Sequence, residues 1–353
     1  MSHPEPAPVS LAECRIVRLN AELFPPSQEE REACGRFGIE PVPVESESVA
    51  KLQQVVAGAD AVFAVSVKLP AEVIAAMDRC RVISRMGAGT DRIDVQEATR
   101  RGILVTNVPD FCVEEQADHA MAMLLALERQ LKRMDHDTAA GHWTGSRKAS
   151  GRNHRLPGRT LGLVGFGRSA KAMARRARGF GLRVLATRRR EVDDPEVAEL
   201  EVELVGLEEL LARSDYVSLH LPLTAETRHL LDAQALSRMK PDAILINTSR
   251  GAIVDEDALV TALDENRLRG AGLDVFERIN VHDPDEVPPT GDPLLGRDDI
   301  VLTPHVAAFS VESRRDVVEG SVTNLVDVLQ GRWPTGENIV NAAVTPRWPL
   351  VER

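Results

Sequence analysis

Short apolar segments alternate with amphipathic stretches of helical periodicity along most of the chain. In the N-terminal part, the predicted strands are 15–19, 61–65, 81–85 and 103–107, and the predicted helices are 47–56, 71–77 and 95–101. Apolar strands that alternate with helices are typical of a parallel sheet covered by helices. The pattern therefore predicts an α/β fold for this part of the chain.

A second alternating series follows an amphipathic helix at 113–138 and a polar loop at 141–157. Its predicted strands are 160–164, 183–186, 216–219, 244–247, 270–275 and 300–303. Six strands of this kind make a complete doubly wound dinucleotide domain. The last helix, 311–330, has no strand partner nearby, so we expect it to pack on the first series. We therefore predict two doubly wound parallel-sheet domains. A Rossmann dinucleotide-binding domain at 109–307 is inserted into a flavodoxin-like substrate domain formed by 1–108 and 308–353.

Length, charge and cysteine content narrow the classes of protein that fit this pattern. A chain of 353 residues is long enough for two domains, and a net charge of −11 argues against nucleic acid as a partner. No apolar run is long enough to span a bilayer, and the N-terminus lacks the apolar core of a signal peptide. The four cysteines are scattered without metal-ligand spacing, as expected of reduced thiols. We therefore expect a cytoplasmic protein with no membrane partner and no metal site.

The segment G-F-G-R-S-A at 165–170 carries the clearest chemical signal. It lies between the predicted strand 160–164 and an alanine-rich helix at 171–180, which is the context of a dinucleotide-binding turn. Gly165 permits the tight turn, and Gly167 lets the backbone approach a pyrophosphate at the N-terminus of the helix. The alternative, a plain turn with incidental small residues, is disfavoured by the flanking strand and helix.

Five further motifs occur in the order found in a known protein family. They are Met86-Gly87-Ala88-Gly89-Thr90-Asp91, His220-Leu221-Pro222-Leu223-Thr224, Asn247-Thr248-Ser249-Arg250-Gly251, Leu273-Asp274-Val275-Phe276 and Thr303-Pro304-His305. Together with the glycine turn, they make the chain resemble the D-isomer-specific 2-hydroxyacid dehydrogenases over roughly residues 50–345. The resemblance implies a nicotinamide cofactor and a small 2-oxo or 2-hydroxy acid substrate. It also implies a homodimer, built by the helix from residue 113 and the neighbouring 141–157 loop.

Reduction of a 2-oxo acid needs a hydride, a proton for the carbonyl oxygen and a cation for the carboxylate. His305 is the predicted acid/base, because imidazole titrates near neutral pH. Arg250, at the carboxyl end of a strand, is predicted to bind the carboxylate through its planar fork. A structural histidine and a surface arginine are the alternatives. By resemblance, backbone N–H groups around Gly87, Ala88 and Gly89 also hold the carboxylate.

The cofactor prediction departs from the usual NAD pattern of the family at one position. NAD-binding members place an acid at the end of the second strand, whereas this chain has Arg188 there. Arg188 and Arg189, with the Thr187 hydroxyl, would bind a 2′-phosphate, so we expect NADP(H) to be preferred to NAD(H). Alternatively, Arg188 stacks on the adenine and NAD(H) remains acceptable. The predicted cofactor-binding residues are Gly165, Gly167, Arg168, Ser169, Thr187, Arg188, Arg189, Leu221, Pro222, Thr227, Thr248, Ser249 and Asp274.

A second departure concerns the partner of the catalytic histidine. The family places a glutamate beside that histidine, five residues after Asp274, but this chain has Ile279 at that position. Without the carboxylate the proton affinity of His305 falls, because a nearby negative charge favours imidazolium. Glu286, in the acidic segment that follows, and Glu277 are candidate substitutes. The alternative is that these acids form only a solvated loop.

Two functions of different kinds fit these residues. The first is an NADP(H)-preferring oxidoreductase that reduces a 2-oxo acid, such as glyoxylate or hydroxypyruvate, or oxidises the CH–OH group of a 2-hydroxy acid. The second is a cofactor-sensing regulatory protein with little turnover, similar to the co-repressor branch of the family. That branch has a tryptophan three residues after the histidine, where this chain has Ala308, so the analogy is weaker. Oxidation of an unusual small anion is a third reading.

Overall fold

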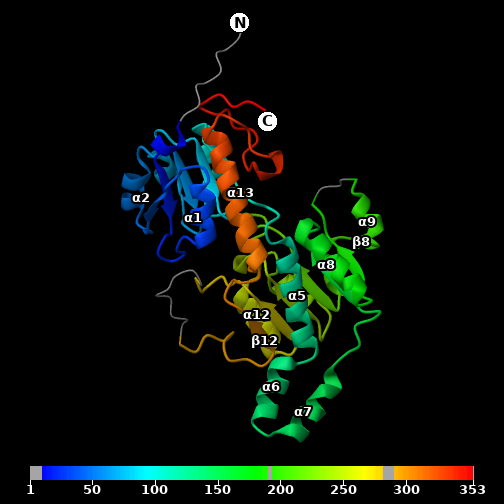
Figure 1. Ribbon diagram of the computed structural model, residues 1–353. Helices are drawn as coiled ribbons and strands as arrows, with labels where there is room; N and C mark the ends of the chain where they lie inside the picture. Colours follow the sequence, from blue (N-terminus) through cyan, green and yellow to red (C-terminus); the bar gives the residue numbers. More distant parts are fainter. Residues whose placement is uncertain (1–9, 190–192, 281–289, 353) are drawn as a thin grey trace. The chain divides into compact units, whose positions relative to one another are not determined.

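The computed structural model describes residues 10–189, 193–280 and 290–352, which fold into two compact units. Unit 1 contains the described residues up to Phe111 together with those from Ser310 onward, and unit 2 runs from Cys112 to Phe309. Unit 2 is therefore inserted into the sequence of unit 1 (Figure 1).

Unit 1 is built on a five-stranded parallel sheet in the order β2-β1-β3-β4-β5. Its strands are β1 (Ile16–Leu19), β2 (Val42–Val44), β3 (Ala61–Ala64), β4 (Val82–Arg85) and β5 (Leu104–Thr106). This is the flavodoxin-like order, as predicted. The sequence pattern missed β2, because this edge strand is largely exposed, contains Pro43 and shows no apolar run.

Helices cover both faces of this sheet. They are α1 (Gln28–Gly35), α2 (Val49–Val56), α3 (Ala71–Ala75), α4 (Val95–Arg100) and α13 (Val311–Leu329), with the 3₁₀ turns η1 (Leu11–Glu13) and η4 (Gly336–Asn338). Successive strand residues point to opposite faces. Thus Phe63 packs in the cluster that holds α1 and α13, and Val62 packs with α2 and α3. The Ser84 hydroxyl donates to the carbonyl oxygen of Ser321 in α13 at 2.9 Å, so α13 packs on this sheet as predicted.

Unit 2 is built on a seven-stranded parallel sheet in the order β12-β11-β10-β9-β6-β7-β8. Its strands are β6 (Thr160–Val164), β7 (Arg183–Ala186), β8 (Val202–Leu204), β9 (Tyr216–Leu219), β10 (Ile244–Asn247), β11 (Gly270–Leu273) and β12 (Ile300–Leu302). The six strands from β8 to β11 follow the doubly wound Rossmann order, and β12 extends the sheet by one strand beyond β11. The prediction of six strands missed β8, an edge strand with a single buried residue.

Helices again cover both faces of the sheet of unit 2 (Figure 1). The helices of this unit are α5 (Val113–Glu128), α6 (Leu131–Ala139), α7 (Trp143–Ala149), α8 (Arg168–Gly179), α9 (Pro195–Glu199), α10 (Leu207–Arg213), α11 (Ala233–Ser237) and α12 (Glu256–Asp264), with η2 (Ser150–Arg152) and η3 (Gly251–Ile253). One core cluster holds α5 and α8, and the other holds α10, α11 and α12. Both faces of the sheet are therefore buried under helices, which explains why the sequences of its inner strands are almost continuously apolar.

Two predictions for the segment before β6 are wrong. The helix predicted at 113–138 is divided into α5 and α6, because Gln130 adopts a left-handed conformation with φ 53° and ψ 38°. The loop predicted at 141–157 contains α7, whose side chains are mostly exposed and so leave no apolar stripe in the sequence. Helices α6 and α7 form a hairpin that projects from the rest of unit 2 (Figure 1).

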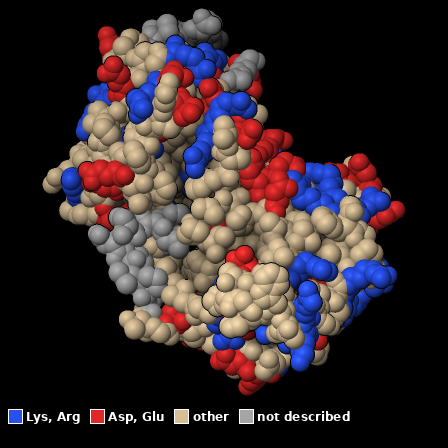
Figure 2. Space-filling view, turned by 60° about the horizontal axis from the view of Figure 1, so that its bottom comes forward, with Lys and Arg blue, Asp and Glu red and all other residues tan. Residues whose placement is uncertain are grey.

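Charged side chains of both signs are interspersed on the face seen in Figure 2. Among the described residues, ion pairs also link neighbouring helices, such as Arg176 with Asp118 at 2.6 Å and Arg175 with Glu114 at 3.1 Å, which join α8 to α5. Each exposed pair stabilises the fold by less than about 1 kcal/mol. The apolar contact between α5 and α8 is therefore the main contribution that holds these two helices together.

Candidate functional site

The glycine turn after β6 has the geometry of a ligand cradle. Gly165 has φ +93°, and a Cβ there would lie 2.4 Å from the carbonyl oxygen of His220, so only glycine fits. Gly167 caps α8, and a Cβ on it would meet nothing within 4 Å. The first amide to donate within α8 is Lys171 N, to Gly167 O at 3.0 Å. The preceding N–H groups of the turn thus have no acceptor within the helix and present a positive end to the open space.

The neighbouring predicted residues lie around this turn. Arg168 is exposed on the first turn of α8, and the Ser169 hydroxyl lies 3.1 Å from Nδ1 of His220. Burial lowers the pKa of His220 to about 4, so the ring is neutral near pH 7. After His220, Leu221 is partly buried and Pro222 is exposed. Thr227 Oγ1 donates to Pro222 O at 2.8 Å and thereby closes the loop.

The end of β7 lies against the same turn. Thr187 Oγ1 accepts a hydrogen bond from the N–H of Gly165 at 3.0 Å. The guanidinium of Arg188 lies 5.7 Å from the centre of the Phe166 ring, and Arg189 is exposed. Arg188 also forms an ion pair with Asp194, a residue that the sequence did not single out. The structure therefore brings Thr187 and Arg188 to the glycine turn, but with an acid already bound to the arginine.

The end of β10 presents three predicted residues in succession. The Ser249 hydroxyl donates to Leu219 O at 2.5 Å, and Arg250 Nη1 donates to Ser249 O at 2.7 Å. Thr248 is 4% exposed, and its hydroxyl contacts no hydrogen-bonding partner among the described residues. A Cβ on Gly251 would lie 1.9 Å from the carbonyl carbon of Phe276, so this close approach fixes the backbone next to Arg250.

His305 follows β12 in a left-handed conformation with φ 57°. The backbone N–H of His305 donates to the backbone carbonyl oxygen of Asp274 at 2.8 Å. The Asp274 carboxylate, fully buried, accepts hydrogen bonds from the Thr303 hydroxyl at 2.6 Å and from the N–H groups of Val306 at 2.9 Å and Ala307 at 3.0 Å. Burial raises the pKa of Asp274. The Asp274 carboxylate thus holds the turn that carries His305. Its predicted contact with the cofactor stays a prediction.

Two further polar side chains of α5 reach this edge of the sheet. Nε2 of His119 lies 2.9 Å from the Thr303 hydroxyl, and Gln116 Nε2 donates to Thr248 O at 2.8 Å. Sequence reasoning missed both residues. The signal was present, because two polar residues three positions apart share one face of a helix that is otherwise apolar on that side.

The candidate substitutes for the missing glutamate lie in different situations. The Glu277 carboxylate binds Arg228 and lies 2.8 Å from Nε2 of His229. Glu277 is therefore engaged with a histidine other than His305. Glu286 lies outside the described residues. Ile279 is partly exposed.

The glycine loop of unit 1 is held by its own backbone and neighbours. Gly87 has φ +149°, its carbonyl accepts from Val108 N at 3.1 Å, and Asn107 Nδ2 donates to Ala88 O at 2.6 Å. Arg85 Nε donates to Gly89 O at 2.9 Å. Within the described residues, no acceptor takes up the N–H groups of Ala88 and Gly89. The loop thus offers backbone N–H donors, and their contact with the substrate carboxylate, implied by the family resemblance, stays a prediction.

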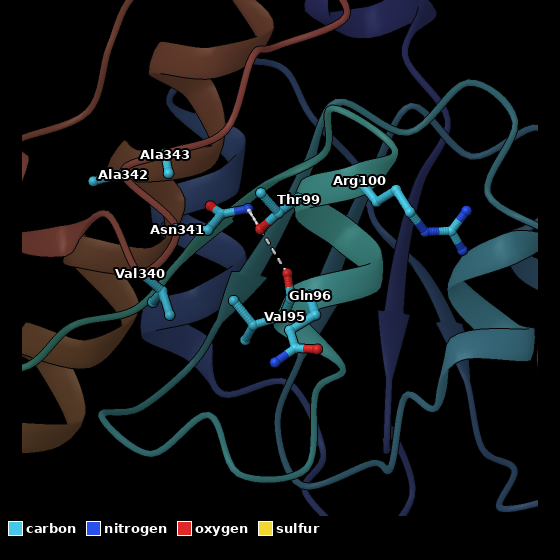
Figure 3. Close-up of a pocket in the computed structure, with 8 residues that line it drawn as sticks. All are labelled: Val95, Gln96, Thr99, Arg100, Val340, Asn341, Ala342 and Ala343. Carbon is cyan, nitrogen blue, oxygen red and sulfur yellow. Dashed lines mark hydrogen bonds between the residues drawn. The ribbon is translucent and has the colours of Figure 1, made fainter.

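A hollow of about 510 Å³ in unit 1 is a weaker candidate (Figure 3). It lies between α4 and residues 340–343. Its central polar side chain, Asn341, donates to Thr99 Oγ1 and to Ile103 O, both at 3.0 Å, and accepts from Val105 N at 2.8 Å. The guanidinium of Arg100 points away from these side chains and pairs with Glu97. The amide of Asn341 and the guanidinium of Arg100 are therefore both engaged within the protein.

No cluster of three or more histidine, cysteine, aspartate or glutamate side chains suited to a metal ion occurs in the described part of the chain. Among the helices that the structure describes, none combines the length and apolar character needed to cross a bilayer. No disulfide joins the four cysteines, and burial raises the pKa of the Cys34 and Cys80 thiols to about 12.

Residues 121–307 match the sequence model of the D-isomer specific 2-hydroxyacid dehydrogenase, NAD binding domain. A glyoxylate reductase of Korarchaeum cryptofilum is 44% identical over 280 residues, which cover 78% of this chain and 80% of that protein. Two solved structures are also similar. D-lactate dehydrogenase of Aquifex aeolicus, complexed with NAD and lactic acid, has a TM-score of 0.80 and 28% identity, covering 92% of this chain and 99% of that one. The NADPH-dependent glyoxylate/hydroxypyruvate reductase of Sinorhizobium meliloti, in complex with citrate, has a TM-score of 0.77 and 30% identity, covering 94% and 99%.

Proposed function

The chain belongs to the D-isomer-specific 2-hydroxyacid dehydrogenase family, and from this premise we propose that it reduces a small 2-oxo acid with a nicotinamide dinucleotide. One feature of unit 2 carries the proposal. The carboxyl edge of its sheet combines an open glycine cradle at Gly167, the buried hydroxyl of Thr248, and a histidine, His305, held in a left-handed turn. Ligands of doubly wound sheets bind at this edge.

The residues present fit a dinucleotide. At Gly167 the turn leaves open the space that a side chain would occupy, and the N-terminus of α8 favours a pyrophosphate there. The Thr248 hydroxyl is buried and lacks a described partner, so a ligand group would satisfy it. When bound, the reduced nicotinamide supplies the hydride. We assign the cofactor to unit 2.

His305 donates the proton to the carbonyl oxygen of the 2-oxo acid and removes it in the reverse direction. Its position depends on Asp274, whose three hydrogen bonds to residues 303–307 fix the turn. Arg250 binds the substrate carboxylate through its guanidinium fork, and its backbone is fixed by the close contact of Gly251 with Phe276. In unit 1, we keep the N–H groups of Ala88 and Gly89 as predicted donors for a carboxylate. Each reacting charge then has a partner from this chain.

We favour NADP(H) over NAD(H), because Arg188 and Thr187 lie at the glycine turn where an acid would repel a 2′-phosphate. The similarity to the NADPH-dependent enzyme of S. meliloti supports this preference, and the similarity to the NAD complex of A. aeolicus D-lactate dehydrogenase keeps NAD(H) open. Glyoxylate and hydroxypyruvate are the first substrates to test, given the names of these relatives.

The test is a fluorescence titration of the full chain with NADPH and NADH, followed by turnover with a panel of 2-oxo acids monitored by absorbance. We expect turnover with at least one small 2-oxo acid. His305→Asn should abolish turnover and keep cofactor affinity, and Arg250→Lys should raise KM because the ammonium lacks the planar fork. Absence of turnover with every acid would contradict the proposed reaction, even if a nucleotide binds.

We further propose a homodimer that uses the α6–α7 hairpin. Leu131 and Trp143, at the starts of α6 and α7, are 54% and 61% exposed, which is unusual for large apolar side chains on a projecting hairpin. Burial of this surface in a two-fold contact would remove it from water. Light scattering after size exclusion should give twice the chain mass, and Trp143→Glu should shift the protein to monomer. A monomeric parent protein would contradict this assembly.

A further inference from the structure

Four charged side chains form a compact cluster beside the glycine turn of unit 2. Arg188, at the end of β7, pairs with Asp194. Lys171, on the first turns of α8, lies 2.9 Å from the Asp194 carboxylate and 2.5 Å from that of Glu196. The Asp194 side chain is 9% exposed and that of Arg188 is 17% exposed. The pairing is therefore partly shielded from solvent, where an ion pair is stronger than on an open surface.

The cluster lies where the adenosine end of a dinucleotide would be selected. Arg188 is within cation–π distance of Phe166, the residue between the two glycines of the turn. The adjacent Thr187 hydroxyl accepts from the N–H of Gly165. The cation that would bind a 2′-phosphate is thus already neutralised by a carboxylate of the same chain.

We propose that Asp194 sets the discrimination between NADPH and NADH, because its carboxylate competes with the 2′-phosphate for Arg188. This inference rests on the proposed binding of a nicotinamide dinucleotide. A 2′-phosphate must displace Asp194 from Arg188 or bind beside a negative charge, and both reduce the affinity for NADPH. NADH has only hydroxyl groups at this place, so the Arg188–Asp194 pair remains when it binds.

Lys171 makes the displacement possible. Hydrogen bonds from Lys171, and then from Arg188, hold the pKa of Asp194 below its usual range, so the carboxylate is ionised near pH 7. When Arg188 turns to a phosphate, Asp194 keeps its contact with Lys171 at 2.9 Å. The carboxylate is not left buried and unpaired, which would be strongly unfavourable. The protein therefore accepts both cofactors, with a smaller preference for NADPH than Arg188 alone would produce.

Asp194→Asn is the discriminating variant. The side chain of Asp194 caps α9 by accepting from Glu196 N, and asparagine is an equally good cap, so the fold of α9 is kept. Binding of NADPH and NADH to the full chain is measured by nucleotide fluorescence at low and high salt. We expect the Kd for NADPH to fall about tenfold at low salt, the effect of one charge-assisted hydrogen bond. The Kd for NADH should change less than about twofold, and added salt should reduce the NADPH effect.

Two control variants separate competition from a general change of charge. Glu196→Gln removes the same charge from the neighbourhood of Lys171 but does not contact Arg188, so the Kd for NADPH should change by less than about threefold. In Arg188→Ala, the further change Asp194→Asn should strengthen NADPH binding by less than about threefold, because only the direct repulsion between Asp194 and the phosphate remains. This double-mutant cycle isolates the pair.

Several results would overturn the inference. D194N could weaken NADPH binding, which would mean that Asp194 orients Arg188 for the phosphate instead of competing with it. A gain that is equal for both nucleotides, or that persists undiminished without Arg188, would also refute competition. If the parent protein binds neither nucleotide, the proposed function and this inference fall together. If it binds both but reduces no 2-oxo acid, only the proposed reaction fails, and the D194N titrations still decide the inference.

Discussion

Substitution of the first glycine of the turn, Gly165→Ala, is the sharpest test of how the fold builds the cofactor site. The new Cβ would lie 2.4 Å from the carbonyl oxygen of His220 and 3.4 Å from Cβ of Leu221. A contact of 2.4 Å with backbone cannot be relieved by a side-chain rotation, so the strand β6 and the loop after β9 must separate locally.

The expected magnitude follows from two effects at this residue. Overpacking of a rigid site costs about 1–3 kcal/mol. A non-glycine residue forced to a positive φ, here +93°, costs roughly another 1–3 kcal/mol. A destabilisation of about 3 kcal/mol lowers the Tm of a domain of this size by about 6–12 °C. Calorimetry of the full chain measures this shift, and fluorescence titration with NADPH measures the accompanying loss of affinity.

Gly167→Ala is the matched control. Its Cβ would meet nothing within 4 Å, and Gly167 has φ −96°, which any residue adopts. Loss of glycine at the cap costs less than about 1 kcal/mol, so the Tm should stay close to that of the parent. The methyl group would nevertheless stand where the pyrophosphate must approach, and the Kd for NADPH should rise about tenfold or more. A G165A protein with an unchanged Tm would refute the steric reasoning. A G167A protein that loses stability but binds NADPH normally would refute the assignment of the turn.

Three other perturbations test separate parts of unit 2. Asp274→Asn should lower kcat at least about tenfold with little change in cofactor Kd, because an amide cannot accept all the hydrogen bonds that fix the His305 turn. Folding stability should decrease by about 3 kcal/mol between pH 6.5 and 4, because burial lowers the pKa of His220 to about 4 and the unfolded state binds the proton first. Urea unfolding at several pH values measures this loss, which His220→Gln should remove. Ile279→Glu should restore the carboxylate expected beside His305, which favours the protonated imidazole. The pKa at which kcat/KM for the reduction falls on the alkaline side should then rise by about one unit.

Each of these expectations has a specific contrary outcome. An unchanged kcat in D274N would show that the His305 turn is held by other contacts. The sign of the pH effect is definite: the stability linked to His220 is fully present above pH 6.5 and is lost as the pH falls toward 4, so a loss on the alkaline side would have another origin. Glu277→Gln is the control for I279E, because Glu277 binds His229 and its removal should leave the activity profile in place. An equal shift in both variants would contradict the special role of position 279.

Short-range patterns of apolar and polar residues were sufficient to predict most of the helices and strands. The inner strands β6, β7, β9 and β10 were predicted with their observed bounds, since both faces of each are buried and nearly every residue is apolar. The exposed edge strands β2 and β8 were missed for the converse reason. The break between α5 and α6 was also missed, because Gln130 adopts its left-handed conformation without the glycine that usually signals one.

The sequence by itself determined the inner strands of unit 2 and the glycine turn, because burial on two faces and a positive φ at Gly165 restrict the residue type at single positions. Only the tertiary structure decided which charges meet. It paired Arg188 with Asp194, directed Glu277 to His229, and buried the Asp274 carboxylate under the His305 turn. The sequence contains many acidic and basic residues, so each of them has several possible partners. The path of the chain through the strands and loops decides which partners come within contact distance. The candidate site residues could therefore be identified from the sequence. Their hydrogen-bond and ion-pair partners, which affect ligand affinity and the protonation of side chains, could be identified only from the tertiary structure.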